Sequence, residues 1–198
     1  MSPKESSREE ILDAAEDVVL ELGAGHLMLD MVAQRAGVSK GGLMYNFPTK
    51  EALLTAMVHR MSQIIRDQRE RVRATIPPGP PQELKAHVLS LLEPEQDSRK
   101  EQVRAALLAA AAINPKLLEP IRDEYESFLA DMASSGMKFE RAAVVALAAD
   151  GLRLLAILKV SALPAQQRDA VIAEMLRLAD EGRKEEPAPT GAGTGRQE

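Results

Sequence analysis

The chain of 198 residues contains no cysteine and no tryptophan, and aromatic residues make up only 3% of it. The absence of cysteine excludes a disulfide framework, a thiolate zinc site and a cysteine nucleophile. It also fits the reducing cytoplasm, where we expect the protein to act. The scarcity of aromatic side chains argues against an aromatic cage of the kind that binds quaternary ammonium groups.

Catalytic and cofactor motifs are missing as well. The three histidines, His26, His59 and His87, have no metal-ligand spacing with one another and belong to no recognisable histidine–carboxylate motif. The glycine-rich residues 191–195 follow no strand, so they do not form a phosphate-binding loop. We therefore predict no metal, no cofactor and no enzymatic activity.

An overall excess of basic residues is also absent, because the net charge is −5. Any contact with nucleic acid must therefore come from a local patch. Residues 28–50 form such a patch, in which Arg35, Lys40 and Lys50 stand against Asp30 and give a local charge of +2.

Apolar residues recur at helical spacing along the chain, and no strand-like alternation is found. Capping boxes at Ser6 and Ser7 predict that the first helix begins near these residues. Pro120 predicts a kink or a late start in a later helix. Beyond residue 50, helices are expected over 50–74, 82–93, 101–113, 115–134, 139–160 and 164–180. We predict an all-α protein.

Composition divides the chain into three parts. Residues 1–50 contain the basic patch, residues 51–183 form a second helical domain, and residues 184–198 have too few apolar side chains to build a core. We predict that this last segment is a disordered tail. The prolines of residues 77–81 are the clearest internal break.

Residues 28–50 have the pattern of a helix-turn-helix, and the rest of the chain is organised around them. Gly37 can take a positive φ and turn the chain after a short helix. Ser39 can cap the second helix, and Leu43 and Phe47 lie four residues apart on one apolar face. Two short helices joined by such a turn are typical of DNA-binding proteins.

The second helix of this motif carries residues suited to DNA. Lys40 suits a phosphate or a guanine edge. Gly41 and Gly42 let the backbone approach a phosphate, although a loose start of the helix is the alternative. Tyr45 can donate its hydroxyl group to a phosphate, pack its ring in the small core, or do both, since the ring is apolar and the tip is polar.

The end of the same helix allows two further contacts. Asn46 either pairs with adenine or backbone phosphate, or caps the C-terminus of the helix. Met44 offers an apolar contact, for example to the methyl group of thymine.

Two segments, 8–23 (REEILDAAEDVVLELG) and 29–54 (LDMVAQRAGVSKGGLMYNFPTKEALL), resemble the N-terminal domain of TetR/AcrR-type transcriptional regulators. The resemblance implies a three-helix DNA-binding domain followed by a helical domain for ligand binding and dimerisation. It also implies that Lys50 contacts a phosphate. The predicted DNA-binding residues are Ser39, Lys40, Gly41, Gly42, Met44, Tyr45, Asn46 and Lys50.

Two positions depart from the pattern of the family. Members usually cap the first helix of the motif with threonine or serine, whereas this chain has Leu27 and Met28, one of which is expected to act as a hydrophobic staple. The usual aromatic pair and histidine appear here as Met44, Tyr45 and Asn46, so one phenol is lost and an amide replaces the histidine. Because this hydroxyl cap is missing, we expect the beginning of the motif to be less rigidly held than its turn and second helix.

Residues 142–160 are nearly apolar and approach the ~20 residues that a membrane span needs. Asp150 and Arg153 lie near the middle, where each charge costs at least about 2.5 kcal/mol on insertion. A helix buried both by its own core and by a second subunit is the better interpretation. We therefore predict that residues 139–180 form a homodimer interface of two helices per subunit, and no membrane span.

The middle helices are expected to enclose a pocket for a small apolar or amphipathic molecule, because methionine suits varied apolar ligands. Asp150 and Asp131 can attract a cation, or they are paired or face solvent. Each lining candidate has a plain core position as its alternative. The candidates are Met57, Met61, Leu92, Leu108, Tyr125, Phe128, Met132 and Asp150.

These features predict a ligand-responsive transcriptional regulator, in our interpretation a repressor that binds a palindromic operator in double-stranded DNA as a dimer. A ligand near Met57 or Met61 is expected to move the helix that begins at Lys50 and to release the DNA. An architectural DNA-binding protein or an activator without a ligand is the alternative.

Overall fold

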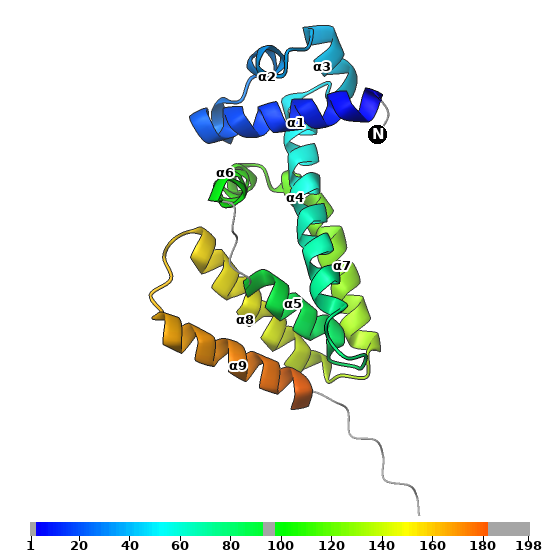
Figure 1. Ribbon diagram of the computed structural model, residues 1–198, viewed down its shortest axis with the longest axis vertical. Coiled ribbons are helices and arrows are strands. Elements are labelled where there is room, and N and C mark those ends of the chain that lie inside the picture. Colours follow the sequence, from blue (N-terminus) through cyan, green and yellow to red (C-terminus); the bar gives the residue numbers. More distant parts are fainter. Residues whose placement is uncertain (1–2, 93–97, 182–198) are drawn as a thin grey trace, which may run out of the picture.

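The computed structural model describes residues 3–92 and 98–181, and its regular elements within these ranges are all helices (Figure 1). The all-α prediction is confirmed. The tail predicted to be disordered lies outside the described residues. In chain order the elements are α1 (Pro3–Leu22), η1 (Ala24–His26), α2 (Leu29–Ala36), α3 (Lys40–Asn46), α4 (Lys50–Arg73), α5 (Gln82–Leu92), α6 (Ser98–Ile113), η2 (Pro115–Leu118), α7 (Glu119–Ser134), α8 (Phe139–Ile157) and α9 (Ala165–Glu181).

Some helix boundaries differ from the sequence prediction. The first helix begins at Pro3 rather than near Ser6, because the fixed φ of proline suits a first helical position. The stretch after residue 115 begins with a 3₁₀ turn, and α7 then starts with Pro120 in its first turn. Of the two expected effects of Pro120, the late start of the helix is therefore the correct one.

The first three helices form a small unit at one end of the molecule, which we call the head (residues 3–46, Figure 1). The helix α4 runs from the head toward the other end, and its 24 residues span about 36 Å. The helices α8 and α9 lie side by side at the far end, with α5 packed against both of them and against α4. The helix α6 lies between the head and these distal helices.

Two hydrophobic cores hold these helices together. The first core combines the head with the first half of α4, and it also takes in Val103, Leu107 and Ala111 from α6. The second core joins α5, α7, α8 and α9 around residues such as Leu84 and Met132. The helix α4 thus connects the head with the distal helices, and α6 packs against α1 and η1 of the head and against α8.

The long apolar helix α8 is covered on one side only. Ala142, Val145 and Ala149 are buried in the second core, whereas Val144 and Leu147 on the other side are 62% and 61% exposed. Within one chain, therefore, this helix is not buried all round. None of the helices in 3–92 and 98–181 combines the length and the apolar character that crossing a membrane requires.

Candidate nucleic-acid interface and internal cavity

The turn between α2 and α3 is built as the sequence indicates. Gly37 follows α2 with φ 67° and ψ 22°, the left-handed conformation that glycine adopts without strain. The amide of the next residue, Val38, then donates to the carbonyl of Ala33 at 3.0 Å. This arrangement closes the C-terminus of α2 and aims the chain into α3.

The start of α3 is fixed by a side-chain cap. The amide of Gly42 donates to Oγ of Ser39 at 3.1 Å, which satisfies one exposed donor of the helix N-terminus. On the inner face Leu43 and Phe47 are fully buried in the first core. The cap sets where the helix begins, and the two apolar side chains set which face points outward.

The outer face of α3 is polar and open to solvent. Lys40, Gly41, Met44 and Tyr45 are all exposed, and the side chain of Tyr45 is 73% exposed. The ring of Tyr45 is therefore not packed in the small core, which was one of the positions expected for it. Its hydroxyl group can reach a ligand outside the protein.

The two glycines of α3 have different surroundings. A Cβ added to Gly42 would lie 3.3 Å from Oγ of Ser39, so the absence of a side chain there leaves room for the cap. A Cβ added to Gly41 would meet nothing within 4 Å. The fold itself does not require glycine at position 41, although glycine costs about 1 kcal/mol in a helix relative to alanine.

Two basic residues of the predicted patch are paired with carboxylates. Nζ of Lys40 lies 2.9 Å from Asp30. Arg35 donates two hydrogen bonds, of 2.8 and 2.7 Å, to Glu21 of α1, and these bonds lower the pKa of that carboxyl group. The count of +2 over residues 28–50 is therefore too high for the surface as folded, because it omits Glu21.

The remaining predicted contacts lie at the edges of this surface. Nζ of Lys50 donates to the carbonyl of Gly25 at 2.6 Å, which ties the start of α4 to η1. An ammonium group has three donors, so this bond leaves capacity for a phosphate. Nδ2 of Asn46 donates to the carbonyl of Gly42 at 3.0 Å, within its own helix, as the capping alternative describes.

The beginning of the helix-turn-helix lacks a side-chain cap. Met28 is the N-cap residue of α2 and makes no capping hydrogen bond. Leu27 is buried in the first core, whereas Met28 is exposed, so Leu27 is the residue that anchors this end by apolar packing. Asp30 lies in the first turn of α2, where a carboxylate favours the exposed amides.

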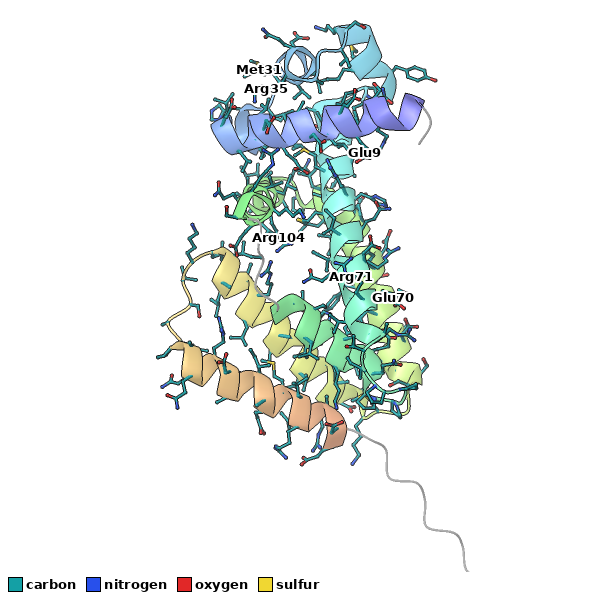
Figure 2. All side chains as sticks on the ribbon, viewed as in Figure 1. Glu9, Met31, Arg35, Glu70, Arg71 and Arg104 are labelled. Atoms are coloured by element: carbon teal, nitrogen blue, oxygen red, sulfur yellow. The ribbon has the colours of Figure 1, made fainter. Side chains whose placement is uncertain are left out.

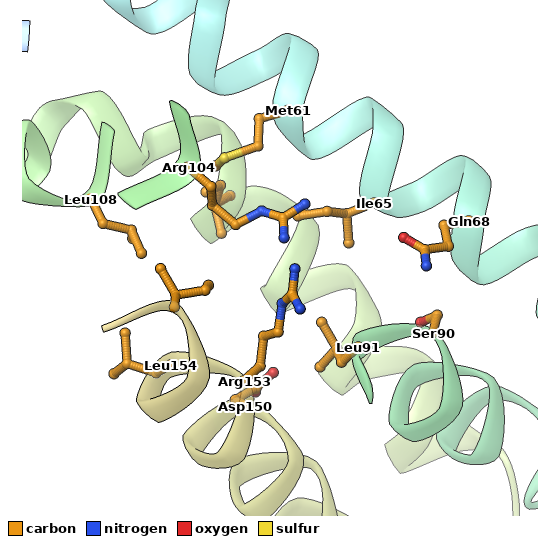
Figure 3. Close-up of a pocket in the computed structure, with 12 residues that line it drawn as sticks. Met61, Ile65, Gln68, Ser90, Leu91, Arg104, Leu108, Asp150, Arg153 and Leu154 are labelled. Carbon is orange, nitrogen blue, oxygen red and sulfur yellow. The ribbon is translucent and has the colours of Figure 1, made fainter. Parts of the chain in front are cut away.

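A cavity of about 180 Å³, partly open to solvent, lies between α4, α5, α6, α7 and α8 (Figure 3). Its wall is largely apolar, but two arginines point into it from opposite sides. Arg104 comes from α6 and Arg153 from α8, and their guanidinium groups face one another across the cavity. Its lining residues are Met61, Ile65, Gln68, Ser90, Leu91, Arg104, Leu108, Ile121, Asp150, Arg153, Leu154 and Ile157.

A second cavity of about 140 Å³ shares part of this wall, including Ile65 and Asp150. The carboxylate of Asp150 accepts a hydrogen bond of 2.9 Å from the hydroxyl group of Tyr125 and lies 3.1 Å from Nε2 of His87. His87 is buried and stacks on Phe128, with ring centroids 4.4 Å apart. Burial, and then the bond to Asp150, raises the pKa of Tyr125 to about 12.

The predicted ligand-binding residues fall into three groups. Met61, Leu108 and Asp150 line the larger cavity, and Tyr125 and Phe128 line the second one. Met57 and Met132 line neither of these cavities and are buried in the first and second cores, although Met57 also borders a small pocket of about 30 Å³. The side chain of Leu92 lies outside the described residues.

Sequence reasoning missed the two arginines that point into the larger cavity. Arg153 was noted only as a charge that opposes membrane insertion, and Arg104 stands in an alanine-rich helix that gives no sign of its direction. The sequence could have indicated Arg153, because a charged residue within a nearly apolar helix usually faces a partner or a cavity inside the protein. Arg104 carried no comparable signal.

A wider crevice of about 680 Å³ lies where the head meets α6 and η2. Its wall includes His26, Lys50 and several small residues of α6, and the strongly exposed Ile113 borders it. This crevice separates part of α6 from the start of α4.

Two family models match the chain. Residues 82–180 match the model of the tetracyclin repressor-like C-terminal domain, and residues 11–57 match the model of bacterial regulatory proteins of the tetR family. The chain belongs to the TetR family of bacterial transcriptional regulators. The resemblance inferred from the helix-turn-helix is therefore confirmed, and it extends through the C-terminal helices.

Individual relatives support this membership. The HTH-type transcriptional regulator RutR of Escherichia coli K12 is 39% identical over 59 residues, which cover 30% of this chain and 28% of RutR. The chain thus matches less than a third of that relative. A transcriptional regulator from Rhodococcus sp. Rha1 aligns over 91% of this chain and 99% of its own, with TM-score 0.69 and 25% identity.

A further solved structure shares the fold. The multidrug binding protein EbrR, complexed with imidazole, aligns over 93% of this chain and 92% of its own, with TM-score 0.59 and 21% identity. The helical head followed by a larger helical domain is therefore an arrangement found in several proteins of this type.

Proposed function

We propose that this TetR-family protein is a dimeric repressor that binds DNA through α3 and leaves it when a small molecule occupies the central cavity. The observation that carries the proposal is the outer face of α3. Lys40, Gly41, Met44 and Tyr45 are exposed together, while Leu43 and Phe47 hold the same helix rigidly on the core beneath it.

Each exposed group on α3 suits a different part of a duplex. Lys40 can exchange its surface ion pair with Asp30 for a phosphate, and Tyr45 can donate its hydroxyl group to another phosphate. The open space at Gly41 lets the backbone approach DNA closely, which explains a glycine that the fold does not need. Met44 is placed to contact a base edge in the major groove.

The exposed face of α8 supports dimerisation through residues 139–180. Val144, Leu147 and Leu158 follow helical spacing on its uncovered side, and Gly151 lies between them with open space around its Cα. Apolar side chains flanking a glycine allow close packing of two helices. We infer that this face and part of α9 meet the same face of a second copy.

Two helices connect the cavity to the head. Met61 of α4 and Arg104 of α6 line the cavity, and other residues of both helices are buried in the first core. An ion pair of 2.6 Å between Arg99 of α6 and Asp17 of α1 adds a polar link. The crevice beside α6 leaves room for this helix to move relative to the head.

Repression follows from the geometry of a dimer. Two copies of α3 must lie about 34–36 Å apart to enter successive major grooves on one face of the duplex. A molecule in the cavity that binds better when α4 and α6 are displaced favours a different separation. The ligand can then lower the DNA affinity by at most the ratio of its own affinities for the displaced state and for the DNA-binding state.

The presence of the cavity favours this function over an architectural DNA-binding protein without a ligand. The description of EbrR as a multidrug binding protein also supports a role for the C-terminal helices in binding small molecules. A regulator of transcription acts where the chromosome is, so we infer that it works in the cytoplasm.

Selection from a pool of random duplexes tests the proposal. We expect the full-length chain to enrich an inverted repeat with half-sites about 10 base pairs apart, or a multiple of that distance. The affinity for this duplex should fall steeply with salt, with a slope of about −0.9 for each phosphate contacted. No enrichment, or an affinity that does not change with salt, would contradict DNA binding.

A further inference from the structure

We propose that the effector carries a neutral aromatic ring with a hydroxyl group, which occupies the second cavity and forms a hydrogen bond with Ser62. This inference rests on the proposed function, because it treats the two adjoining cavities as the effector site. It goes further by stating the size, the charge and one polar group of the ligand.

The first argument is a buried hydroxyl group that the protein leaves without a partner. Ser62 of α4 is only 2% exposed and lines the second cavity. Its Oγ makes no hydrogen bond to any of the residues that the structure describes. Burying a hydroxyl group without a partner is costly, and a polar atom of a ligand in the cavity removes that cost. A serine hydroxyl can donate and accept, so a hydroxyl group of the ligand suits it in either direction.

Ser62 shares one face of α4 with other residues of this wall. Ile65 and Arg69 follow it at spacings of three and seven residues, and both line the same cavity. The helix α4 runs beside α7 and packs against α5, and these two helices supply most of the remaining wall (Figures 1 and 2). A ligand that binds Ser62 therefore contacts the helix that leads to the head.

The second argument is the aromatic wall of a cavity that has the size of one ring. The chain contains three phenylalanines and two tyrosines, and Phe128 and Tyr125 both line this cavity. Their ring centroids lie 6.0 Å apart, and the ring of His87 stacks on Phe128. Aromatic rings attract one another edge to face or in offset stacks. A cavity of about 150 Å³ is known to hold benzene, so the 140 Å³ here fits one six-membered ring.

The third argument is that the charges around this cavity are matched. The carboxylate of Asp150 accepts a hydrogen bond from Tyr125 with one oxygen, and its other oxygen lies 3.1 Å from Nε2 of His87. Of the alternatives expected from the sequence, Asp150 is therefore paired with side chains of the protein rather than placed to attract a cation.

A second carboxylate and two arginines complete this balance. Glu124 is paired with Arg66 at 2.5 Å. Arg69 lies over the ring of Phe128, 5.3 Å from its centroid, where a cationic ligand would otherwise bind. With His87 neutral, two carboxylates stand against two guanidinium groups, so the wall favours neither an anion nor a cation. A phenolic hydroxyl group ionises only near pH 10, so a phenol is neutral at the pH of the cell.

Calorimetry with phenol and toluene tests the inference on the full-length chain. The two probes have nearly the same shape, and only phenol carries a hydroxyl group. We expect both to bind the natural chain. In Ser62→Ala the ratio of the phenol affinity to the toluene affinity should fall by about fivefold or more, because only phenol loses a hydrogen bond. The same ratio in both chains, or no binding of phenol, would overturn the assignment.

Two further measurements show that Ser62→Ala acts on the ligand. Ser135 is a half-buried serine whose hydroxyl group already donates to the carbonyl of Met132 at 2.8 Å, so Ser135→Ala should leave both affinities unchanged. Ser62→Ala should not lower the free energy of unfolding of the ligand-free chain, since it removes a hydroxyl group without a partner. A clear loss of stability in urea unfolding would contradict this account of Ser62.

A larger side chain at the same position locates the ring. Ser62→Leu fills part of the second cavity and should abolish the binding of both phenol and toluene. A circular dichroism spectrum like that of the natural chain shows that this variant is folded. If the folded variant bound toluene as the natural chain does, the ring would lie elsewhere and the assignment would be wrong.

Charged analogues test whether the cavity selects a neutral ring. Benzoate and benzylammonium carry the same ring with an anionic or a cationic substituent. Each should bind more weakly than phenol to the natural chain, because the charges of the wall are already matched. Binding of either ion as tight as that of phenol, or tighter, would overturn the neutral class.

A DNA-binding assay separates this inference from the proposed function. Phenol should weaken the binding of the selected duplex to the natural chain, and should have less effect on Ser62→Ala. Phenol that binds without changing the DNA affinity would show that the ring is not part of an effector. If the natural chain binds DNA but no phenol, the ligand class is wrong while the regulator stands. If it binds phenol through Ser62 but no DNA, the ligand site stands while the proposed function is wrong.

Discussion

The head and the central cavity position their functional side chains by different means. In the head, the exposed face of α3 is set by neighbours in the sequence, because Gly37 makes the turn and Ser39 caps the helix. In the cavity, Arg104 and Arg153 meet only after α6 and α8 have packed into the fold. Local rules therefore specify the proposed DNA-binding surface, whereas long-range packing specifies the proposed ligand site.

The two regions also differ in how their charges are satisfied. On the head, Lys40 and Arg35 form surface ion pairs, which are worth little and exchange easily for another anion. In the cavity, the guanidinium group of Arg153 faces another arginine rather than a carboxylate. We therefore expect DNA to compete with carboxylates of the protein for the basic side chains of the head.

The largest effect is expected from a charge on the uncovered face of α8. Leu147→Asp should make the protein monomeric at micromolar concentration, since a buried unpaired carboxylate opposes association. DNA affinity should fall on the order of 100-fold because two linked half-sites no longer bind together. Sedimentation measures the first effect. Ile113→Asp, at another exposed apolar residue, should remain dimeric, and a dimeric Leu147→Asp would exclude this interface.

The next effect compares a core residue of the head with a wall residue of the cavity. Leu43→Ala removes a fully buried side chain and should lower the free energy of unfolding by about 2–5 kcal/mol. Leu108→Ala borders existing space and should cost about 1 kcal/mol or less, because little packing is lost. Urea unfolding measures both. Equal losses would show that the cavity wall is packed as tightly as the core.

The contrast between local patterns and long-range packing also explains which features of the fold could be predicted from the sequence. The cap at Ser39, the turn at Gly37 and the buried pair Leu43 and Phe47 follow from patterns within a few residues, and all are found in the structure. The direction of Arg104 depends on the angle at which α6 crosses α8, and no local pattern encodes that angle. For the same reason Met132 was assigned to a pocket although it lies in the second core.

A smaller effect should separate stability from binding on α3. Gly41→Ala should raise the free energy of unfolding by about 0.5–1 kcal/mol, because alanine favours a helix and its Cβ meets no other atom. DNA affinity should nevertheless fall several-fold. Gly42→Ala is the matched variant and should gain less stability, since its Cβ would crowd Ser39. If Gly41→Ala bound DNA as before, close approach of the backbone would not be the reason for this glycine.

The smallest effect concerns Tyr125 at alkaline pH. Its pKa is raised to about 12 in the folded chain, so above pH 10 the unfolded state ionises first and the folded state loses stability relative to it. Tyr125→Phe lacks this ionisation. The stability advantage of the natural chain over Tyr125→Phe should thus be constant below pH 10 and shrink above it in urea unfolding. If the difference in unfolding free energy between the natural chain and Tyr125→Phe did not vary with pH, burial and Asp150 would not raise the pKa of Tyr125.

The central claim is that the outer face of α3 binds DNA, and the pair Lys40 and Asp30 tests it most directly. Lys40→Ala removes both the ammonium group and the ion pair, whereas Asp30→Ala removes the ion pair, and a carboxylate from the first turn of α2, but keeps the ammonium group. By fluorescence anisotropy on the selected duplex, Lys40→Ala should weaken binding and reduce the salt slope by about 1. Asp30→Ala should bind at least as tightly as the natural chain. Equal weakening by both variants, or by neither, would contradict a contact between Lys40 and DNA.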